Sequence, residues 1–404
     1  MLYLYNYTKT ILFNKYYLSY LSKILNIVSF YNNKRAILNP THRFFEISDD
    51  FRNPFARDRD RVIHAGSFRK LEYKTQVFLN SEGDFFRTRL THSIEVSQIA
   101  RSIASTLGLV ESLAESIALS HDLGHTPFGH IGGDTLDECL REQGFKNGFE
   151  HNFQSFRVVT KLEQRYKSFL GLNLTYATLE GILKHSYPYK KSFIPDSISE
   201  IFHMDKHPSI EAMIVDRADE IAYISHDIDD GIASGLITFD TLRSNPLANI
   251  ILQKVYDEGI SEDESEMFRY RFSSHLINHL VYSMLDYSRA NIDNSRVLCS
   301  VYDATSPLVI GFEPSLESEI KKLKKLLFQK LYQHKEIVRK MFAGKQAIRG
   351  LYSALSGEPK MLPTYYKNQC DIRAPHRVVS DYIASMSDRY AMKLYNELYG
   401  YGLY

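Results

Sequence analysis

Three separate segments of the sequence carry histidine and carboxylate side chains that could bind one divalent metal ion. They are Arg87-Thr-Arg-Leu-Thr-His92, Ser120-His121-Asp122-Leu-Gly-His125 and Val215-Asp-Arg-Ala-Asp219-Glu-Ile-Ala-Tyr223. Two imidazoles and two carboxylates form a mixed nitrogen and oxygen donor set, which suits Mg, Mn, Fe, Co or Zn and leaves positions open for water or phosphate. The spacing by itself is weak support, because a histidine beside an apolar stripe is more often a hydrogen-bonded core residue.

The elements that carry these side chains are predicted to be helices. Apolar residues recur at helical spacing in 93–109, 111–121 and 209–226. His92 then opens the first helix, and His121 ends the second. Asp219 lies within the third on the apolar face of Val215 and Ala222, where a carboxylate is costly unless it is paired or bound to metal.

The rest of the pattern predicts an all-α fold. No run of strand period with hairpin signals stands out, and only 12 Pro and 20 Gly interrupt the chain. The segment 315–345 is predicted to be a Lys-rich helix whose charges form a solvated face. Three histidines, His121, His125 and His130, fall within ten residues around a turn that contains Gly and Pro, which strengthens the case for a polar site there.

Composition limits the classes of function. The formal charge of +1 over 404 residues excludes a globally basic nucleic-acid binder, although not a local basic patch. Three cysteines without CxxC spacing favour reduced thiols and a cytoplasmic location. No run of 18 apolar residues occurs, so no membrane span is expected.

The first 44 residues differ from the rest, because Glu46 is the first acidic residue of the chain. We predict a poorly ordered N-terminal extension over 1–44. The alternative is a membrane-surface helix or a transit-like arm, since the segment mixes Lys and Arg with apolar residues.

The site motifs resemble the HD superfamily, whose signature is similar to His92…His121-Asp122…Asp219. Flanking segments resemble, more narrowly, the bacterial dGTPase-like deoxynucleoside triphosphate triphosphohydrolases, from about residue 45 to about 398. These segments are Phe55-Ala-Arg-Asp-Arg-Asp-Arg-Val-Ile-His64, Phe68-Arg-Lys-Leu-Glu-Tyr-Lys-Thr-Gln-Val-Phe78, Arg87-Thr-Arg-Leu-Thr-His-Ser93, His121-Asp-Leu-Gly-His-Thr-Pro-Phe-Gly-His130, Phe149-Glu-His-Asn-Phe-Gln-Ser155 and Ser380-Asp-Tyr-Ile-Ala-Ser-Met-Ser-Asp-Arg-Tyr-Ala391.

The resemblance implies a metal-dependent reaction and a domain organisation. Water attacks the α-phosphorus of a dNTP and releases deoxynucleoside and inorganic triphosphate, with Mg, Mn or another transition metal as the cofactor. It implies one helical domain over 45–404, with an HD core at about 89–227 and a helical C-terminal elaboration. The implied metal ligands are His92, His121, Asp122 and Asp219.

The resemblance also implies which residues handle the phosphates and the proton. His130 matches the catalytic histidine, His125 a contact to the substrate phosphate, and His151 a further active-site histidine. Arg89 matches the phosphate-binding arginine. Because a triphosphate carries about four negative charges, other cations are also needed. The nearby pool is Arg59, Arg61, Arg69, Lys70 and Lys74.

A sugar site is implied by four further residues. Tyr223 and Asp227 match a sugar-contacting pair, with Tyr223 under the ribose ring and Asp227 accepting from the 3′-OH. Gln76 matches a second partner of the 3′-OH. Val77 matches the bulk that excludes a 2′-OH. A core tyrosine at position 223 is the alternative interpretation.

One position departs from the pattern of that family. Near relatives carry an acid three residues after the catalytic histidine, where this chain has Gly133, and Asp134 follows one residue later. Asp134 would lie about 100° further round a helix, so either it substitutes for the acid or the proton relay is weakened.

Two other functions stay open at this point. One is another HD phosphohydrolase, a nucleotidase or phosphodiesterase that acts on a smaller or cyclic phosphate. The other is a non-enzymatic or weakly active member that binds dNTP or nucleic acid. The expected partners are the dNTP substrate and further copies of this chain as a homo-oligomer, with possible weak binding of single-stranded nucleic acid.

Overall fold

A computed structural model describes residues 40–48, 51–76, 86–186, 193–295, 302–303 and 309–400. Over these residues the fold is all-α, as the hydrophobic periodicity predicts, with one two-residue antiparallel strand pair between β1 (Lys206–His207) and β2 (Tyr302–Asp303). None of the described helices combines the length and the apolar character that crossing a bilayer requires.

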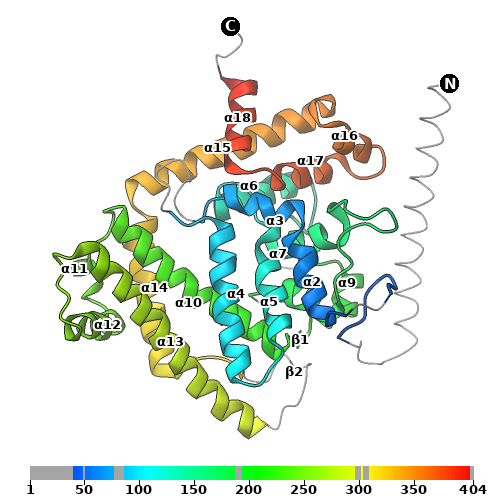
Figure 1. The fold of residues 1–404 in the computed structure, drawn as a ribbon. Helices are drawn as coiled ribbons and strands as arrows, with labels where there is room; N and C mark the ends of the chain where they lie inside the picture. The colour runs from blue at the N-terminus through cyan, green and yellow to red at the C-terminus, as the bar shows by residue number, and fades with distance from the viewer. Residues whose placement is uncertain are drawn as a thin grey trace, which may run out of the picture.

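The centre of the molecule is made by the three helices predicted to carry the metal ligands. They are α4 (Arg89–Thr106), α5 (Glu111–Ser120) and α10 (Ile210–Ala233). In Figure 1, α4 and α5 stand side by side, and α10 crosses behind them. Their buried aliphatic faces form a core that α12 (Pro246–Asp257), α13 (Ser265–Ser295) and α14 (Pro314–Leu327) extend.

A second layer closes one end of this bundle. It contains α15 (Lys335–Gly357), α16 (Thr364–Cys370), α17 (Pro375–Ala384) and α18 (Asp388–Tyr399), drawn at the top of Figure 1. Its buried side chains share a core with α6 (Gly129–Glu142), the helix that begins beside His130. The C-terminal helices are therefore packed directly against the turn that carries the predicted catalytic histidine.

A third group of helices covers the other flank. The 3-10 segments η1 and η2 and the π-helical segment η3 continue helices of this group or of the centre. The elements are α2 (Pro54–Ile63), α3 (Gly66–Lys70), η1 (Leu71–Tyr73), η2 (His121–Gly124), α7 (His151–Arg157), η3 (Val158–Leu162), α8 (Tyr176–Leu183) and α9 (Asp196–Ile201). The short α11 (Phe239–Leu242) and the 3-10 segment η5 (Pro359–Met361) complete the described helices.

The predicted Lys-rich helix over 315–345 is wrong as one continuous element. Helix α14 passes into a π-helical turn, η4 (Phe328–Tyr332), and a new helix, α15, starts after His334, whose side chain accepts the Glu336 N–H. The π-helical turn carries Tyr332 inward to contact Asp227. The break therefore directs the polar side chain of Tyr332 toward the site. The prediction of one continuous helix with a solvated face did not include this contact.

The described part of the predicted extension, residues 40–44, packs against the body of the fold. The Arg43 guanidinium binds the buried carboxylate of Asp58 and donates to the Asn173 carbonyl oxygen over 2.7 Å. The Pro40 and His42 carbonyl oxygens accept backbone N–H groups at the start of α8. Residues 1–39 lie outside the described residues, so the poorly ordered extension and the domain limits stay predictions.

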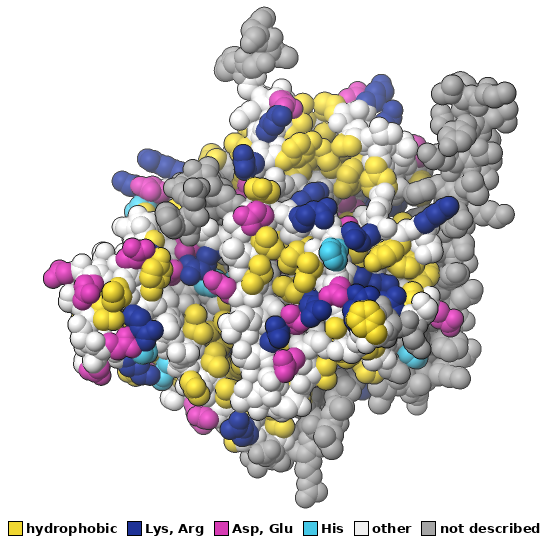
Figure 2. Space-filling model, in the orientation of Figure 1, with side chains coloured by type: hydrophobic (Ala, Val, Ile, Leu, Met, Phe, Trp, Pro, Cys, Tyr) yellow, Lys and Arg dark blue, Asp and Glu magenta, His cyan; other side chains and the backbone are white. Residues whose placement is uncertain are grey.

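Both charge signs are interspersed on the face of the molecule in Figure 2, where basic and acidic side chains alternate with apolar ones. This agrees with the near-zero formal charge.

Candidate active site

Three predicted metal ligands converge where α4, η2 and α10 meet. One nitrogen from each of His92 and His121 and one oxygen from Asp219 all lie within 4.8 Å of one another. The His92 Nε2 atom is 2.8 Å from Asp219 Oδ1, and His121 Nε2 is 3.8 Å from the same oxygen. Both histidines are buried at 1% exposure, so their nitrogens are fixed in direction. This donor set can chelate one divalent cation.

Asp122, the fourth predicted ligand, lies beside this group without being part of it. Its Oδ1 atom lies 3.3 Å from His121 Nε2 and 3.1 Å from His125 Nε2, and its Oδ2 atom accepts a hydrogen bond of 2.8 Å from Arg89. Burial alone would raise the pKa of Asp122, but the neighbouring His121 and Arg89 hold it well below its usual range. The carboxylate is therefore ionised and can offer Oδ1 to a cation.

Local sequence explains why these side chains meet. Thr88 caps α4 in a capping box with Thr91, which places His92 in the first turn of the helix. At the other segment, Gly124 lets α7 approach closely, since a Cβ there would lie 2.1 Å from the Ser155 nitrogen. That close approach brings the start of α7, and with it His151, to the ligand turn.

Contacts with His226 and Glu95 orient His92, and the sequence interpretation missed them. His92 Nδ1 lies 3.3 Å from His226 Nδ1, and the other nitrogen of His226 binds Glu95. Burial lowers the pKa of His226 to about 4, so it is neutral near pH 7. A neutral His226 that donates to Glu95 can accept from His92 Nδ1; in that tautomer the lone pair of His92 Nε2 is directed toward Asp219 and can bind a metal.

His185 supports Asp219 in a similar way and was also missed. Its Nδ1 atom lies 2.5 Å from Asp216, and its Nε2 atom lies 3.4 Å from Asp219 Oδ2. Burial alone would lower the pKa of His185, but Asp216 and Asp219 raise it well above its usual range. The position of His226 seven residues after Asp219, on the same helix side, was a sequence signal for the first pair; nothing comparable marked His185.

A cluster of three imidazoles lies beside the metal ligands. The ring centroids of His125 and His151 are 4.1 Å apart, and His130 lies 5.6 Å and 6.1 Å from them. Burial and the Arg89 charge lower the pKa of His125 to about 3 and also lower that of His130. The structure thus brings all three predicted catalytic histidines together.

Two cavities meet at His130. One, of about 400 Å³, is lined by Asp219, Tyr223 and Lys324 among others, and the other, of about 300 Å³, by His125, His151 and Gly133. Volumes of this size suit a small-molecule site. Lys324 and Arg217 bring positive charge to the larger cavity, although each also pairs with Glu220.

Tyr223 of the predicted sugar pair lines the larger cavity, and buried Asp227 is linked to it through a third residue, Tyr332. The Tyr332 hydroxyl donates to Asp227 Oδ2 and also hydrogen-bonds the Tyr223 hydroxyl. Asp227 Oδ1 is buried and has no hydrogen-bond partner among the described residues, and the same holds for the Gln76 side-chain oxygen. Val77 lies outside the described residues, so its expected role stays a prediction.

The predicted pool of extra cations is mostly engaged in structure. Arg61 donates to the Leu172 and Asn173 carbonyl oxygens, Lys70 to Ser385, and Lys74 to His125 and Ala384. Arg59 pairs with Asp60 and Glu115, and Arg69 lies near the His64 carbonyl. Arg89 keeps a buried Nε–H with no partner among the described residues, which is an open donor beside the ligands.

Gly133 and Asp134 lie in the first turns of α6, beside the smaller cavity. Asp134 is exposed, and its charge raises the pKa of His130 less than that of Asp122 does. Asp134 therefore acts on His130 through its charge.

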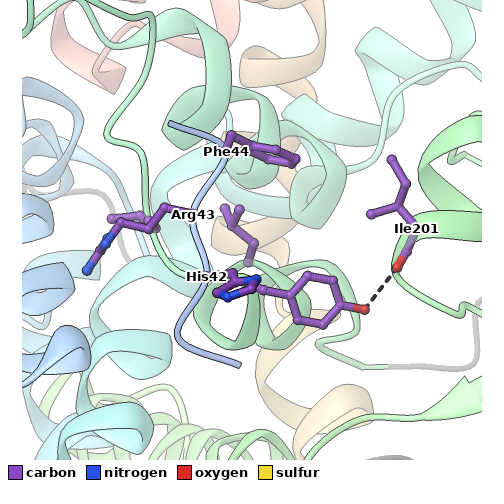
Figure 3. Close-up of a pocket in the computed structure, with 7 residues that line it drawn as sticks. His42, Arg43, Phe44 and Ile201 are labelled. Carbon is purple, nitrogen blue, oxygen red and sulfur yellow. Dashed lines mark hydrogen bonds between the residues drawn. The ribbon is translucent and has the colours of Figure 1, made fainter. Parts of the chain in front are cut away.

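A further cavity near residues 42–44 is too small for a nucleotide. Figure 3 shows it between His42, Phe44 and Ile201, with the Tyr176 hydroxyl donating to the Ile201 carbonyl oxygen. Its volume is about 10 Å³, which is room for about one water molecule.

Comparison with known proteins agrees with this geometry. Residues 89–224 match the HD domain, and residues 310–397 match the phosphohydrolase-associated domain. The chain is 60% identical to a deoxyguanosinetriphosphate triphosphohydrolase-like protein of Wolinella succinogenes, over 90% of this chain and 100% of the relative. Proteins of the same description from Geobacter metallireducens and Thiobacillus denitrificans are 43% and 44% identical, over 88% and 86% of this chain and 91% of each relative.

Proposed function

Since this chain belongs to the deoxyguanosinetriphosphate triphosphohydrolase-like proteins and is a phosphoric ester hydrolase with an HD domain, we propose that it hydrolyses deoxynucleoside triphosphates. The products are deoxynucleoside and inorganic triphosphate. The observation that carries the proposal is the convergence of His92, His121 and Asp219 beside a cavity that also holds His130 and Tyr223.

A divalent metal ion fits the donor set of two imidazoles and two carboxylates, and His92, His121, Asp122 and Asp219 would hold it. When bound, such an ion lowers the pKa of water and neutralises charge on a phosphate oxygen. The neutral state of His226 and the His92–His226–Glu95 chain support this assignment, because a histidine that binds a metal commonly donates its other N–H to a neighbouring acceptor.

The phosphates face a set of cations on two sides of the site. Arg89 offers its free Nε–H from α4, and Lys324 and Arg217 line the larger cavity from α14 and α10. These charges stabilise a triphosphate and its leaving group electrostatically. His130, between the two cavities, is the proton donor or relay at the ester oxygen, and His125 and His151 complete its surroundings.

The sugar lies against Tyr223, with Asp227 as the acceptor of the 3′-OH. Burial raises the pKa of Asp227 well above its usual range, and Tyr332 holds one of its oxygens while the other stays open. Gln76 is the second polar partner, since its amide can present either oxygen or nitrogen. A buried acceptor that awaits a partner favours binding of a substrate with this hydroxyl over binding of a substrate that lacks it.

The test is incubation of the purified protein with each of the four dNTPs and with GTP, in Mg²⁺ or Mn²⁺, followed by chromatography of the products. Inorganic triphosphate and deoxynucleoside are expected. A matched control is Asp219→Asn, which keeps the volume but removes the charge of a ligand. Release of pyrophosphate or orthophosphate by the parent protein would assign a different phosphohydrolase reaction.

A further inference from the structure

Asp388, at the start of α18, joins two distant segments of the candidate active site. Its Oδ2 atom accepts the Thr75 N–H over 2.9 Å, and its Oδ1 atom accepts the Phe128 N–H over 3.0 Å. The carboxylate is buried at 5% exposure. Thr75 precedes Gln76, and Phe128 lies in the turn between His125 and His130. One side chain thus binds the backbone of both segments.

The turn held by Asp388 has a backbone that needs support. Phe128 has a φ of 61° and Gly129 also has a φ of 61°, so a non-glycine residue occupies the left-handed region. The Phe128 side chain packs closely on α15, where a Cβ at Gly344 would come within 2.9 Å of it. Such a conformation persists only where the surrounding structure determines it.

Lys74 provides a second tie between the same parts. Its ammonium group is buried and donates to the carbonyl oxygens of His125 and Ala384. The segment 74–76, the turn 125–130 and the end of α17 are therefore joined at two points. The C-terminal layer therefore contacts both segments and can fix them relative to each other.

We propose that Asp388 is a positioning residue that sets the distance between the sugar contact at Gln76 and the proton-transfer histidine His130. The proposal rests on the proposed function for the roles of these two residues. Because one carboxylate serves both backbone N–H groups, losing it should change how well the enzyme distinguishes sugars as well as how fast it turns over.

The test is Asp388→Asn, which keeps the size of the side chain but can accept only one of the two hydrogen bonds well. We expect kcat for dGTP to fall about tenfold, and the ratio of kcat/KM for dGTP over GTP to fall severalfold. Loss of folded protein alone lowers the rates with dGTP and with GTP equally and leaves that ratio unchanged. An unchanged ratio in a folded Asp388→Asn protein overturns the proposal.

A matched control is Asp58→Asn, which alters another buried carboxylate that accepts a backbone N–H. Its hydrogen-bond partners, Arg43, Thr175 and Thr178, include no residue of the candidate site. We expect this variant to lose stability and to keep the ratio of dGTP to GTP. If Asp388→Asn does not fold, Asp388→Glu keeps both acceptors but displaces them, and the same change of ratio is expected.

Hydrogen exchange of the folded protein separates this proposal from the proposed function, because it needs no turnover. In Asp388→Asn, amide protection is expected to fall together in peptides that contain Thr75 and in peptides that contain Phe128. Loss in only one of them, or in neither, overturns the shared tie even if the parent protein hydrolyses dNTPs. A paired loss in a protein that does not hydrolyse dNTPs upholds the tie and rejects the proposed substrate.

Discussion

Replacing Gly133 by glutamate tests whether a missing acid limits this enzyme. A general acid must be protonated before it can act, and burial together with the Arg89 charge lowers the pKa of His130 below its ordinary value. Asp134 is exposed, and its charge partly offsets this lowering of the pKa. We therefore expect slow intrinsic turnover at neutral pH that still depends on His130.

The structure admits a side chain at position 133. Gly133 is helical, with no left-handed φ, and a Cβ there would lie 3.7–3.8 Å from Phe149 and Thr126, which is ordinary contact. The residue faces the cavity that His130 also lines, and residues three apart on a helix are neighbours. Replacing a glycine within a helix also stabilises it by about 0.5–1 kcal/mol, so folding is not expected to suffer.

The size of the gain follows from the hydrogen bond that a carboxylate would make. A hydrogen bond to a charged group contributes about 1.5–3 kcal/mol. If all of that appeared in the transition state, kcat would rise about ten- to a hundredfold. Position 133 is partly exposed, so we expect the lower end, about tenfold. The carboxylate also raises the pKa of His130, so the basic limb of the pH–rate profile is expected to move to higher pH.

The assay is release of inorganic triphosphate from dGTP with saturating metal, from pH 6 to pH 9. Gly133→Ala is the matched control, because it adds the Cβ without the carboxylate. If Gly133→Glu is no faster than Gly133→Ala, or if the gain survives in a His130→Ala background, the reasoning is refuted. If Asp134→Asn proves as damaging as His130→Ala, then Asp134 has taken the role of the missing acid and the slow-enzyme prediction fails.

Four other changes are expected to have distinct outcomes. His121→Ala should abolish both turnover and bound metal in a folded protein; full retention of both, by metal analysis and circular dichroism, would contradict the site. Val77→Ala should reduce the preference for dGTP over GTP. Equal rates of the parent protein with dGTP and with GTP would contradict the proposed role of Val77. His226→Leu should weaken metal affinity about 10- to 100-fold by calorimetry, because His92 Nδ1 loses its acceptor; unchanged affinity would show that His226 does not orient His92. Burial lowers the pKa of Lys74 to about 7 from 10.5, so the unfolded state holds more protons between these values. The free energy of unfolding of the parent protein, measured with urea, should therefore rise between pH 7 and pH 10.5 relative to that of Lys74→Met, by at most about 1.4 kcal/mol per pH unit. The same pH dependence of the unfolding free energy in both proteins would contradict this prediction.

The helical core was predictable because its periodicity is local. The apolar stripes that predict α4, α5 and α10 are properties of short windows, and so is the carboxylate of Asp219 on an apolar face. The all-α class and the neighbourhood of the predicted ligands follow from these windows together with the resemblance. What local periodicity does not encode is where a helix breaks. The π-helical turn at 328–332 is one case, since the sequence around it continues as a Lys-rich helical pattern.

The parts of the site that escaped prediction come from residues whose importance depends on tertiary packing. Tyr332 reaches Asp227 across 105 positions of sequence, and Asp388 reaches Phe128 across 260. A tyrosine or an aspartate in a helical pattern looks like an ordinary surface residue until its packing partner is known. The Asp388 contacts come from the C-terminal layer, and the Tyr332 contact comes from the π-helical turn before it, so both parts of the chain can help to position the candidate site. If that is right, substitutions confined to 310–397 should alter dNTP selectivity while the metal content stays constant.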